Sequence, residues 1–149
     1  MRAVVQRVTN ASVAVAGQVI GSISQGFMVL LGVMQDDNPA DAAYIVDKIS
    51  NLRIFEDDAG KMNRSLVEVG GEILLISQFT LAGDARKGRR PSFSQAENPD
   101  TAQGIIEDMA DQLRNRGIKV ANGCFGAHMQ VSLVNDGPVT ILLDSSKLF

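Results

Sequence analysis

The chain has 149 residues, of which 45% are hydrophobic and 21% are charged, and its formal net charge is −3 at pH 7. This size and composition are ordinary for one soluble globular domain. The negative charge argues against a general polyanion binder, so a nucleic-acid role would need a local basic patch. The sequence contains no run of 18 apolar residues, so no membrane span is expected. Polar residues interrupt the N-terminal region, whereas a secretory signal would have a continuous apolar core there. One cysteine and one histidine exclude a disulfide framework and argue against a zinc site.

The first quarter of the chain is predicted to form strands. Residues 2–17 alternate apolar and polar side chains with a break at Thr9-Asn10, and a turn leads into a short strand over residues 19–24. Residues 26–34 form a continuous apolar run, which is typical of a strand covered on both faces. This third strand is therefore expected to be buried.

Two helices are predicted from capping signals and helical spacing. The sequence Asp36-Asp37-Asn38-Pro39 is expected to cap the first helix, with Pro39 in its first turn, because a capping side chain followed by proline is typical of a helix start. This helix is expected to end near residue 52. The same pair at Asn98-Pro99 predicts a second helix that runs to about Arg116 and is ended by Gly117.

Shorter strands and turns are predicted for the rest of the chain. Residues 65–69 and 72–81 are expected to form a hairpin that leads into a second buried strand, and residues 82–99 are polar without periodicity. Further strands are expected near residues 53–57, 118–122, 129–135 and 139–143. The predicted fold class is α/β: a single domain over residues 1–149, in which largely antiparallel or mixed sheets form a sandwich or barrel flanked by two helices.

The sequence Asn135-Asp136-Gly137-Pro138 lies between two apolar runs and is a strong hairpin signal, because asparagine, aspartate and glycine accept positive φ. Pro138 does not fit a plain hairpin. It has no amide hydrogen to donate where the returning strand should begin to pair. This proline therefore needs an explanation beyond turn formation.

The stretch from residue 77 to residue 93 is the most informative for chemistry. A buried strand ends in Ser77-Gln78-Phe79-Thr80, and the end of a strand can present polar groups to a cleft. The loop that follows carries four cations and then Phe93; the cations are Arg86, Lys87, Arg89 and Arg90. Clustered cations bind phosphates, and an aromatic ring can stack on a base. The alternative is a solvated basic loop without a partner, and strand-end hydroxyl groups often bond only to the backbone.

Side chains for acid–base or covalent catalysis are scarce. His128 is the one histidine, and a lone histidine is more often a surface or packed residue than a general base. Cys124 is interpreted as a small buried residue rather than a nucleophile. The sequence has no triad, P-loop or dinucleotide-binding fingerprint. An enzyme of this sequence would therefore act by positioning, by backbone amides that form an oxyanion hole, and by groups on the substrate.

Two short motifs, SQFTL at residues 77–81 and NDGPVT at residues 135–140, together resemble the D-aminoacyl-tRNA deacylase (DTD) family, which carries an SQFTL stretch and an N-x-G-P-x-T stretch. The resemblance extends along essentially the whole chain and includes MRAVVQRV, GFMVLLGV, KGRRPSF and GCFGAHMQV. Either motif alone is weak. Both together, in order and in a chain of this length, are specific.

The resemblance implies hydrolysis of the ester that joins a D-amino acid to the 3′-terminal adenosine of tRNA, and removal of glycine mischarged onto tRNA. It implies a cytoplasmic homodimer with two active sites at the subunit interface, without a cofactor or a metal. In the family the Gly-Pro bond is cis, so Gly137 and Pro138 are expected to reach into the active site of the other subunit. There, rigid carbonyls would accept the ammonium of a D-amino acid and collide with an L side chain, whereas glycine would pass.

The resemblance also implies residue roles at the reacting ester. The amides around Phe79 and Thr80 are expected to hold the ester carbonyl, and the adenosine 2′-hydroxyl would help to activate water. Ser77 and Gln78 would position the ester and the ribose. No general base is evident near Thr80 in the sequence, so we expect Thr80 to position the substrate rather than attack it.

Further residues are expected to hold the tRNA end and the Gly-Pro tip. Phe125 and Met129 would form an apolar slot for the terminal adenine, the alternative being ordinary core packing. Arg7 would hydrogen-bond the carbonyls of the Gly-Pro tip, the alternative being an exposed cation on a strand. Arg86, Lys87, Arg89 and Arg90 would bind the tRNA backbone.

Two competing hypotheses remain open from the sequence. One is a non-catalytic RNA-binding module that uses the basic loop, which the lack of side-chain catalysts fits equally well. The other is a small-molecule hydrolase with His128 as its base. Substitution of His128 would abolish activity in that case and have a mild effect in a deacylase.

Overall fold

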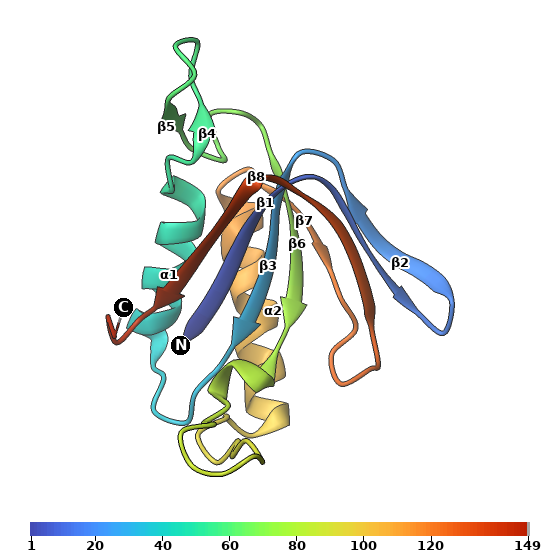
Figure 1. Ribbon diagram of the computed structural model, residues 1–149, viewed down its shortest axis with the longest axis vertical. Helices are drawn as coiled ribbons and strands as arrows, with labels where there is room; N and C mark the ends of the chain where they lie inside the picture. Colours follow the sequence, from blue (N-terminus) through green and yellow to red (C-terminus); the bar gives the residue numbers. More distant parts are fainter. Residues whose placement is uncertain (149) are drawn as a thin grey trace.

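Strand β1 (Arg2–Val15) is the centre of the sheet, because it pairs antiparallel with three other strands. The computed structural model describes residues 1–148. In it, the first half of β1 lies between β3 (Gly26–Gly32) and the end of β8 (Gln130–Asp144). The second half of β1 lies between β2 (Gln18–Ile23) and the start of β8. β1 therefore changes partners midway along its length (Figure 1).

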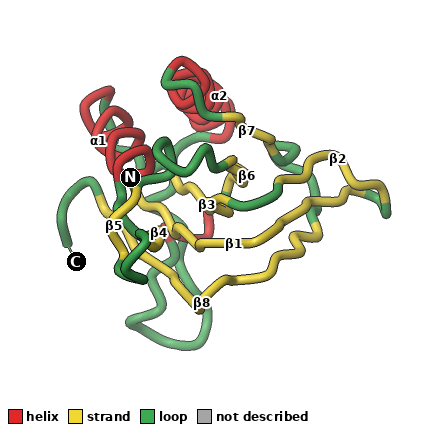
Figure 2. The backbone as a smooth tube through the Cα atoms, turned by 90° about the horizontal axis from the view of Figure 1, so that it is seen from above, coloured by secondary structure: helices red, strands yellow, loops and turns green. Residues whose placement is uncertain are grey.

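The other half of the sheet is parallel. β3 pairs with β6 (Glu72–Ser77), and β6 pairs with β7 (Lys119–Asn122), which gives the strand order β2-β1-β3-β6-β7 with β8 beside β1. Parallel neighbours need crossovers, and helices α1 (Pro39–Asn51) and α2 (Pro99–Asn115) lie in them. Figure 2 shows both helices on the same side of the sheet. Within residues 1–148, no helix combines the length and apolarity needed to cross a membrane.

The sheet curves until its two ends approach each other. β2 contacts β6 and β7 as well as its partner β1. A β-carbon placed on Gly21 in β2 would lie 3.1 Å from the carbonyl oxygen of Asn122 in β7. Glycine at this position therefore lets the two backbones come close. The result is a nearly closed barrel with two flanking helices, which confirms the predicted fold class.

Two apolar clusters lie on either side of the central strands. The larger one lies between the sheet and the helices and includes Phe27, Leu31, Ile45, Ile49 and Leu113. The smaller one fills the curved part of the sheet and includes Val8, Val13, Ile23, Leu74 and Ile76. Successive residues of β3 and β6 point into different clusters, which explains why both strands are continuously apolar.

Both helices begin where the Asn-Pro pairs predicted. The Asn38 side chain accepts a hydrogen bond from the Ala40 amide at 2.8 Å, and Asp41 accepts one from the Asn38 amide at 2.9 Å, which completes a capping box. The hydrogen bond from the Asn38 amide to the Asp41 carboxylate is the main reason why the pKa of Asp41 lies below its ordinary value. The Asn98 side chain accepts an amide hydrogen bond at 3.0 Å in the same way. Gly117 has a φ of +82° just after α2 ends.

The prediction of a hairpin over residues 65–69 and 72–81 is wrong, because residues 65–69 do not form a strand. The hairpin of this region lies earlier, where β4 (Phe55–Glu56) pairs antiparallel with β5 (Met62–Arg64). The carboxylate of Asp57 accepts two amide hydrogen bonds within its turn, at 2.9 and 3.0 Å, and so stabilises that reversal. The chain after β5 forms turns and pairs again only at β6.

The two strands predicted on either side of Asn135-Asp136-Gly137-Pro138 are one strand, β8, and the expected hairpin is not formed. Both halves of β8 pair with β1 in the same direction: Thr140 lies opposite Gln6, and Asn135 lies opposite Val8. One residue of β1 therefore faces the four residues 136–139, which bulge away from the ladder and are called the tip below. Residues in this bulge have no ladder partner in β1, so the missing amide hydrogen of Pro138 costs the strand no hydrogen bond. This explains why the strand tolerates the proline.

Candidate active site

β6 ends in a sharp corner, formed by residues 77–82. Ser77 is the last residue of the strand, and the amide of Gln78 still donates to a carbonyl of β3 at 2.8 Å. Residues 79–82 then form a short 3-10 helix, so the strand predicted to continue to residue 81 stops earlier. The side-chain amide of Gln78 donates to the hydroxyl of Thr80 at 2.5 Å. Phe79 and Thr80 are exposed at this corner.

The backbone amides of Phe79 and Thr80 are hydrogen-bond donors that the corner leaves unpaired. They lie in the first turn of the 3-10 helix, where amides have no acceptor within the helix. Neither amide donates a hydrogen bond to another atom of residues 1–148. Two adjacent unpaired amides can stabilise a carbonyl oxygen that gains negative charge. The corner therefore provides the donors that an oxyanion hole requires.

Residues 77–79 of the corner together line two hollows, one on each side. The small hollow, of about 300 Å³, lies between the corner and the loop that precedes β8. The large hollow, of about 600 Å³, lies between the corner and the start of α2. Residues 77–79 and Phe125 line both hollows. A substrate held at the corner therefore has room on each side.

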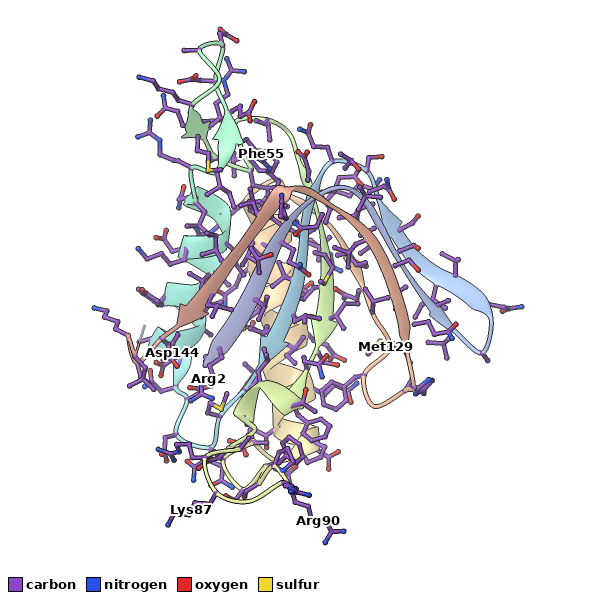
Figure 3. All side chains as sticks on the ribbon, viewed as in Figure 1. Arg2, Phe55, Lys87, Arg90, Met129 and Asp144 are labelled. Atoms are coloured by element: carbon purple, nitrogen blue, oxygen red, sulfur yellow. The ribbon has the colours of Figure 1, made fainter. Side chains whose placement is uncertain are left out.

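The loop between β7 and β8 forms the far wall of the small hollow. Phe125 and Met129 are half-buried there; each packs against the edge of an apolar cluster and also lines the hollow. Met129 is labelled beside this loop in Figure 3. His128 is exposed and lines the same hollow.

Cys124 is exposed in the loop, so its interpretation as a buried residue is wrong. Among residues 1–148, His, Cys, Asp and Glu side chains form no group of three or more that could hold a metal ion.

The four cations of the basic loop are exposed, but they are not equivalent. Asp84 binds Arg86 through two side-chain hydrogen bonds of 2.9 and 2.6 Å. These bonds hold the pKa of the Asp84 carboxyl well below its ordinary value. Lys87, Arg89 and Arg90 make no ion pair with any of residues 1–148. Figure 3 shows Lys87 and Arg90 extending away from the molecule at the end that carries the corner.

The tip is anchored by Arg7 and Asn135. The guanidinium of Arg7 donates to the carbonyls of Asp136 at 3.1 Å and Ile54 at 2.6 Å. Arg7 is only 5% exposed, so it is not a cation on an exposed strand face. The carboxamide of Asn135 donates to the carbonyls of Arg7 and Val139, both at 2.9 Å. Hydrogen bonds thus fix both sides of the base of the bulge.

Gly137 and Pro138 form the exposed end of the tip, and the peptide bond between them is cis. Gly137 has a φ of +129°, a conformation that side chains rarely adopt. A β-carbon on it would lie 2.7 Å from Val139 Cγ2 and 3.2 Å from a guanidinium nitrogen of Arg7. A larger residue at position 137 would therefore press against the anchor of the tip.

The corner and the tip lie at opposite ends of the sheet. Asn135 is opposite Val8 in β1, and Val8 is opposite Gly26 at the start of β3. Ser77 is opposite Leu31 near the end of β3. These two positions are separated by the five residue steps of β3 from 26 to 31, which corresponds to about 17 Å along the strand. The tip of a chain therefore does not reach its own corner (Figure 1).

The burial of Arg7, its contact with Ile54 and the pairing of Asp84 with Arg86 were not predicted from the sequence. Arg7 follows Ala3 and Val5 at a spacing of two, and this alternation already placed its side chain on the buried face of a strand. Asp84 stands two residues before Arg86 in a turn, a spacing that favours a local pair. The contact between Arg7 and Ile54 spans 47 positions and had no local signal.

Residues 4–144 match the family model described as D-Tyr-tRNA(Tyr) deacylase. A protein of Thermosipho africanus named D-aminoacyl-tRNA deacylase is 58% identical over 149 residues, which is 100% of both chains. The chain belongs to the D-aminoacyl-tRNA deacylase family. A further relative of the same name, from Syntrophomonas wolfei, is 60% identical over 149 residues, again 100% of both chains.

Solved structures share the fold of this deacylase family member. One is described as c-Myc DNA Unwinding Element Binding Protein; it is 44% identical, with a TM-score of 0.91 over 97% of this chain and 98% of that chain. Another, described as a probable eukaryotic D-amino acid tRNA deacylase, is 20% identical, with a TM-score of 0.82 over 95% of this chain and 97% of that chain. The second similarity concerns the fold alone.

Proposed function

We propose that the protein hydrolyses the ester bond of D-aminoacyl-tRNA, and that of glycine mischarged on tRNA, and so releases the free amino acid and the tRNA. The observation that carries this proposal is the pair of unpaired amides of Phe79 and Thr80 at an exposed corner between two hollows. Relatives that match the whole chain are named D-aminoacyl-tRNA deacylase, which supports the same substrate. The proposed place of action is the cytoplasm, where tRNA is charged and used.

In the proposed reaction, the ester carbonyl oxygen accepts hydrogen bonds from the amides of Phe79 and Thr80. This oxygen becomes negative when water adds to the carbonyl carbon, so the two amides stabilise the intermediate more than the ester. The adenosine 2′-hydroxyl helps to deprotonate the attacking water. The bond to the ribose 3′-oxygen then breaks, and that oxygen takes the proton. Ser77 and Gln78 position the ester and the ribose, and Thr80 orients the substrate without becoming acylated.

The terminal adenine is proposed to bind in the small hollow, between Phe125 and Met129. An aromatic ring and a thioether both pack well on the face of a base. Both side chains are half-buried and line this hollow, so each can hold its place in the protein and still contact a ligand. Binding there would bring the 3′-ester to the corner.

A second subunit is proposed to complete each active site. The exposed tip lies at the far end of the sheet from the corner of its own chain. A two-fold related partner can place its tip at that corner and receive the reciprocal contact. The proposed assembly is therefore a homodimer with two active sites at the interface.

The proposed chirality filter is the Gly137-Pro138 end of the partner's tip. Its carbonyls accept the ammonium of a D-amino acid and occupy the space that an L side chain would need. Such a filter has to be rigid, and the bonds from Arg7 and Asn135 to the base of the tip support that rigidity. Glycine has no side chain to exclude and therefore passes.

The tRNA backbone is proposed to follow the basic loop. Lys87, Arg89 and Arg90 make no ion pairs with residues 1–148, and Figure 3 shows Lys87 and Arg90 at the same end of the molecule as the corner. Arg86 is held by Asp84, so it contributes less positive potential than the other three. Phosphate contacts at this loop would orient the acceptor end toward the hollows.

A nucleic-acid-binding module without hydrolysis is the second candidate function. The basic loop favours it, and one solved relative of 44% identity is named for binding a DNA unwinding element. Such a module would use the loop and leave an aminoacyl ester intact. A third candidate, a small-molecule hydrolase with His128 as base, gains some support from the exposure of His128 in the small hollow.

Incubation with matched D-tyrosyl-tRNA, L-tyrosyl-tRNA and glycyl-tRNA tests these candidates, with release of the free amino acid as the measurement. We expect hydrolysis of the D and glycyl esters and little hydrolysis of the L ester. Binding of all three tRNAs without hydrolysis would favour the binding module. Loss of all activity in His128→Ala would favour the third candidate, whereas a deacylase should lose little.

A further inference from the structure

The large hollow has no role in the reaction as proposed so far. Its volume of about 600 Å³ falls within the range of about 300–1,000 Å³ that is usual for ligand sites. Much of its wall is apolar and comes from the end of β3 and from Ala102 and Ile106 of α2. Gln35 and Glu97 add polar groups to the same lining. This combination suits a flat apolar ring with a polar edge.

Phe79 and Phe93 form an aromatic wall of the large hollow. Their rings meet edge to face, with centroids 5.2 Å apart and planes at 69°. Phe79 remains 59% exposed and Phe93 38% exposed. A β-carbon on Gly83 would lie 3.1 Å from the Phe93 ring, so glycine at this position leaves the ring its place. Two rings that hold each other and remain open to solvent are a stacking platform for a base.

The large hollow is continuous with the rest of the candidate active site. Residues 77–79 and Phe125 line it together with the small hollow, so the two ligand spaces meet at the corner. On its other side the hollow borders the basic loop, because Phe93 directly follows the strand-like bridge between Asp84 and Ser92 that closes this loop. A chain of nucleotides can therefore pass from the small hollow across the corner toward the cations.

We propose that the large hollow binds the nucleotide that precedes the terminal adenosine, with its base stacked on the Phe79–Phe93 wall and its phosphate directed toward the basic loop. This inference rests on the proposed function, because it assumes that the terminal adenosine occupies the small hollow. In tRNA the preceding nucleotide is a cytidine. The carboxylate of Glu97 is suited to accept a hydrogen bond from the amino group of cytosine.

The amino-acid side chain is the competing occupant of the large hollow. An apolar wall alone would suit it. The polar rim and the adjacent cations favour a nucleotide instead, because a base carries a hydrogen-bonding edge and a phosphate, and an apolar side chain carries neither. The partner's tip is a second competitor, and the experiment below distinguishes the nucleotide from both of these occupants.

Two minimal esters test the proposal: 3′-O-D-tyrosyl adenosine, and the same ester on the dinucleotide cytidylyl-adenosine. Stacking of one additional base should raise kcat/KM of the wild-type protein for the dinucleotide ester by about tenfold or more. Ile106→Trp fills the hollow and should reduce this advantage to about twofold or less. Val67→Trp, an exposed site in the turns between β5 and β6, is the matched control and should keep the full advantage.

A second variant addresses base recognition without filling the hollow. Glu97→Gln should reduce the preference of the protein for the cytidylyl over the uridylyl dinucleotide ester, because a carboxamide offers the base a donor where the carboxylate offered only acceptors. Equal kcat/KM of the wild type for the mononucleotide and dinucleotide esters would overturn the proposal. Equal losses on both esters in Ile106→Trp would do the same and would indicate that the amino-acid side chain or the partner's tip occupies the hollow.

Binding of unacylated cytidylyl-adenosine separates this inference from the proposed function. The dinucleotide should shift the NMR signal of the Ile106 methyl groups, whereas adenosine alone should not. A shift of these signals in a protein that hydrolyses neither ester would refute the proposed hydrolysis and support the nucleotide subsite. Hydrolysis of both esters without a shift would support the hydrolysis and refute the subsite.

Discussion

Ser77 and Asn135 lie at opposite ends of the strand ladder that passes through β3, with five residue steps between their positions. Ser77 begins the corner that carries the unpaired amides, and Asn135 begins the tip. β3 is buried and paired on both edges, by β1 and by β6, so the two ends cannot approach each other within a chain. The proposed active site therefore has to combine the corner of one chain with the tip of another.

Mixed dimers provide a direct test of this arrangement. Gln78→Ala damages the corner, and Gly137→Ala damages the tip, so each variant alone should lose more than about tenfold in deacylation. When the two variants exchange subunits, half of the dimers become mixed, and each mixed dimer has one intact site. We therefore expect recovery to about a quarter of the wild-type rate, measured on D-tyrosyl-tRNA. Each variant exchanged with its own differently tagged copy is the control, and mixed dimers without recovery would contradict a shared site.

The helices could be predicted because their signals are local. Asn38-Pro39 and Asn98-Pro99 each place a capping side chain and a proline within one turn, and both helices begin there. The corner was also predictable in kind, because a continuously apolar strand ends abruptly in polar residues. Its 3-10 turn was not, since a single turn of four residues leaves no periodicity to detect.

The course of β8 could not be predicted for a different reason. Asn135-Asp136-Gly137-Pro138 has the composition of a reversing turn, and a local pattern cannot distinguish a reversal from a bulge. Pairing of both flanking segments with the long strand β1 determines the outcome, and those pairs join residues more than 115 positions apart. The proline was the one local sign that an ordinary hairpin would not form.

Arg7→Lys should weaken the anchor of the tip. A lysine has one terminal nitrogen and cannot donate in the planar arrangement that reaches both Asp136 and Ile54. We expect the free energy of unfolding to fall by about 2 kcal/mol, with a thermal midpoint lower by about 5 °C, and deacylation to fall further than folding alone explains. Calorimetry and a rate on D-tyrosyl-tRNA measure the two effects. Arg64→Lys, at a partly exposed arginine paired with Asp58, should change neither, and a similar result in both variants would remove the special role of Arg7.

Asp84→Asn should strengthen tRNA binding. The substitution releases Arg86 from its pair and adds one unit of positive charge to the basic loop. Binding measured against salt should become steeper by about one unit in a double-logarithmic plot, and KM should fall. Arg90→Gln should have the opposite effect on both quantities. Asp58→Asn makes the same charge change in the β4–β5 hairpin, and no effect is expected there if the loop is the tRNA path.

Thr80→Ala should retain hydrolysis. If Thr80 only orients the substrate, loss of its hydroxyl should reduce the rate by less than about tenfold, whereas loss of a covalent nucleophile costs enzymes on the order of 10⁴ to 10⁶. The carboxamide of Gln78 would lose its acceptor, so a small effect is expected rather than none. Mass spectrometry of the protein during turnover should show no acylated form. An aminoacyl group trapped on Thr80 would replace the water mechanism with a covalent one.

Asn135→Asp should loosen the tip without changing the size of the side chain. The carboxamide of Asn135 donates to the carbonyls of Arg7 and Val139, and a carboxylate cannot donate to either. Two carbonyls would lose their partner and face a negative charge, so we expect the free energy of unfolding to fall by about 2 kcal/mol at neutral pH. The carbonyls also oppose ionisation of the new carboxyl, which raises its pKa in the folded state above that in the unfolded state. Protonation restores one donor, so the deficit should shrink as the pH falls from 7 toward the unfolded pKa. Denaturant unfolding of both proteins across that pH range measures this, and a deficit that is constant with pH would show that Asn135 does not hold the tip by donating hydrogen bonds.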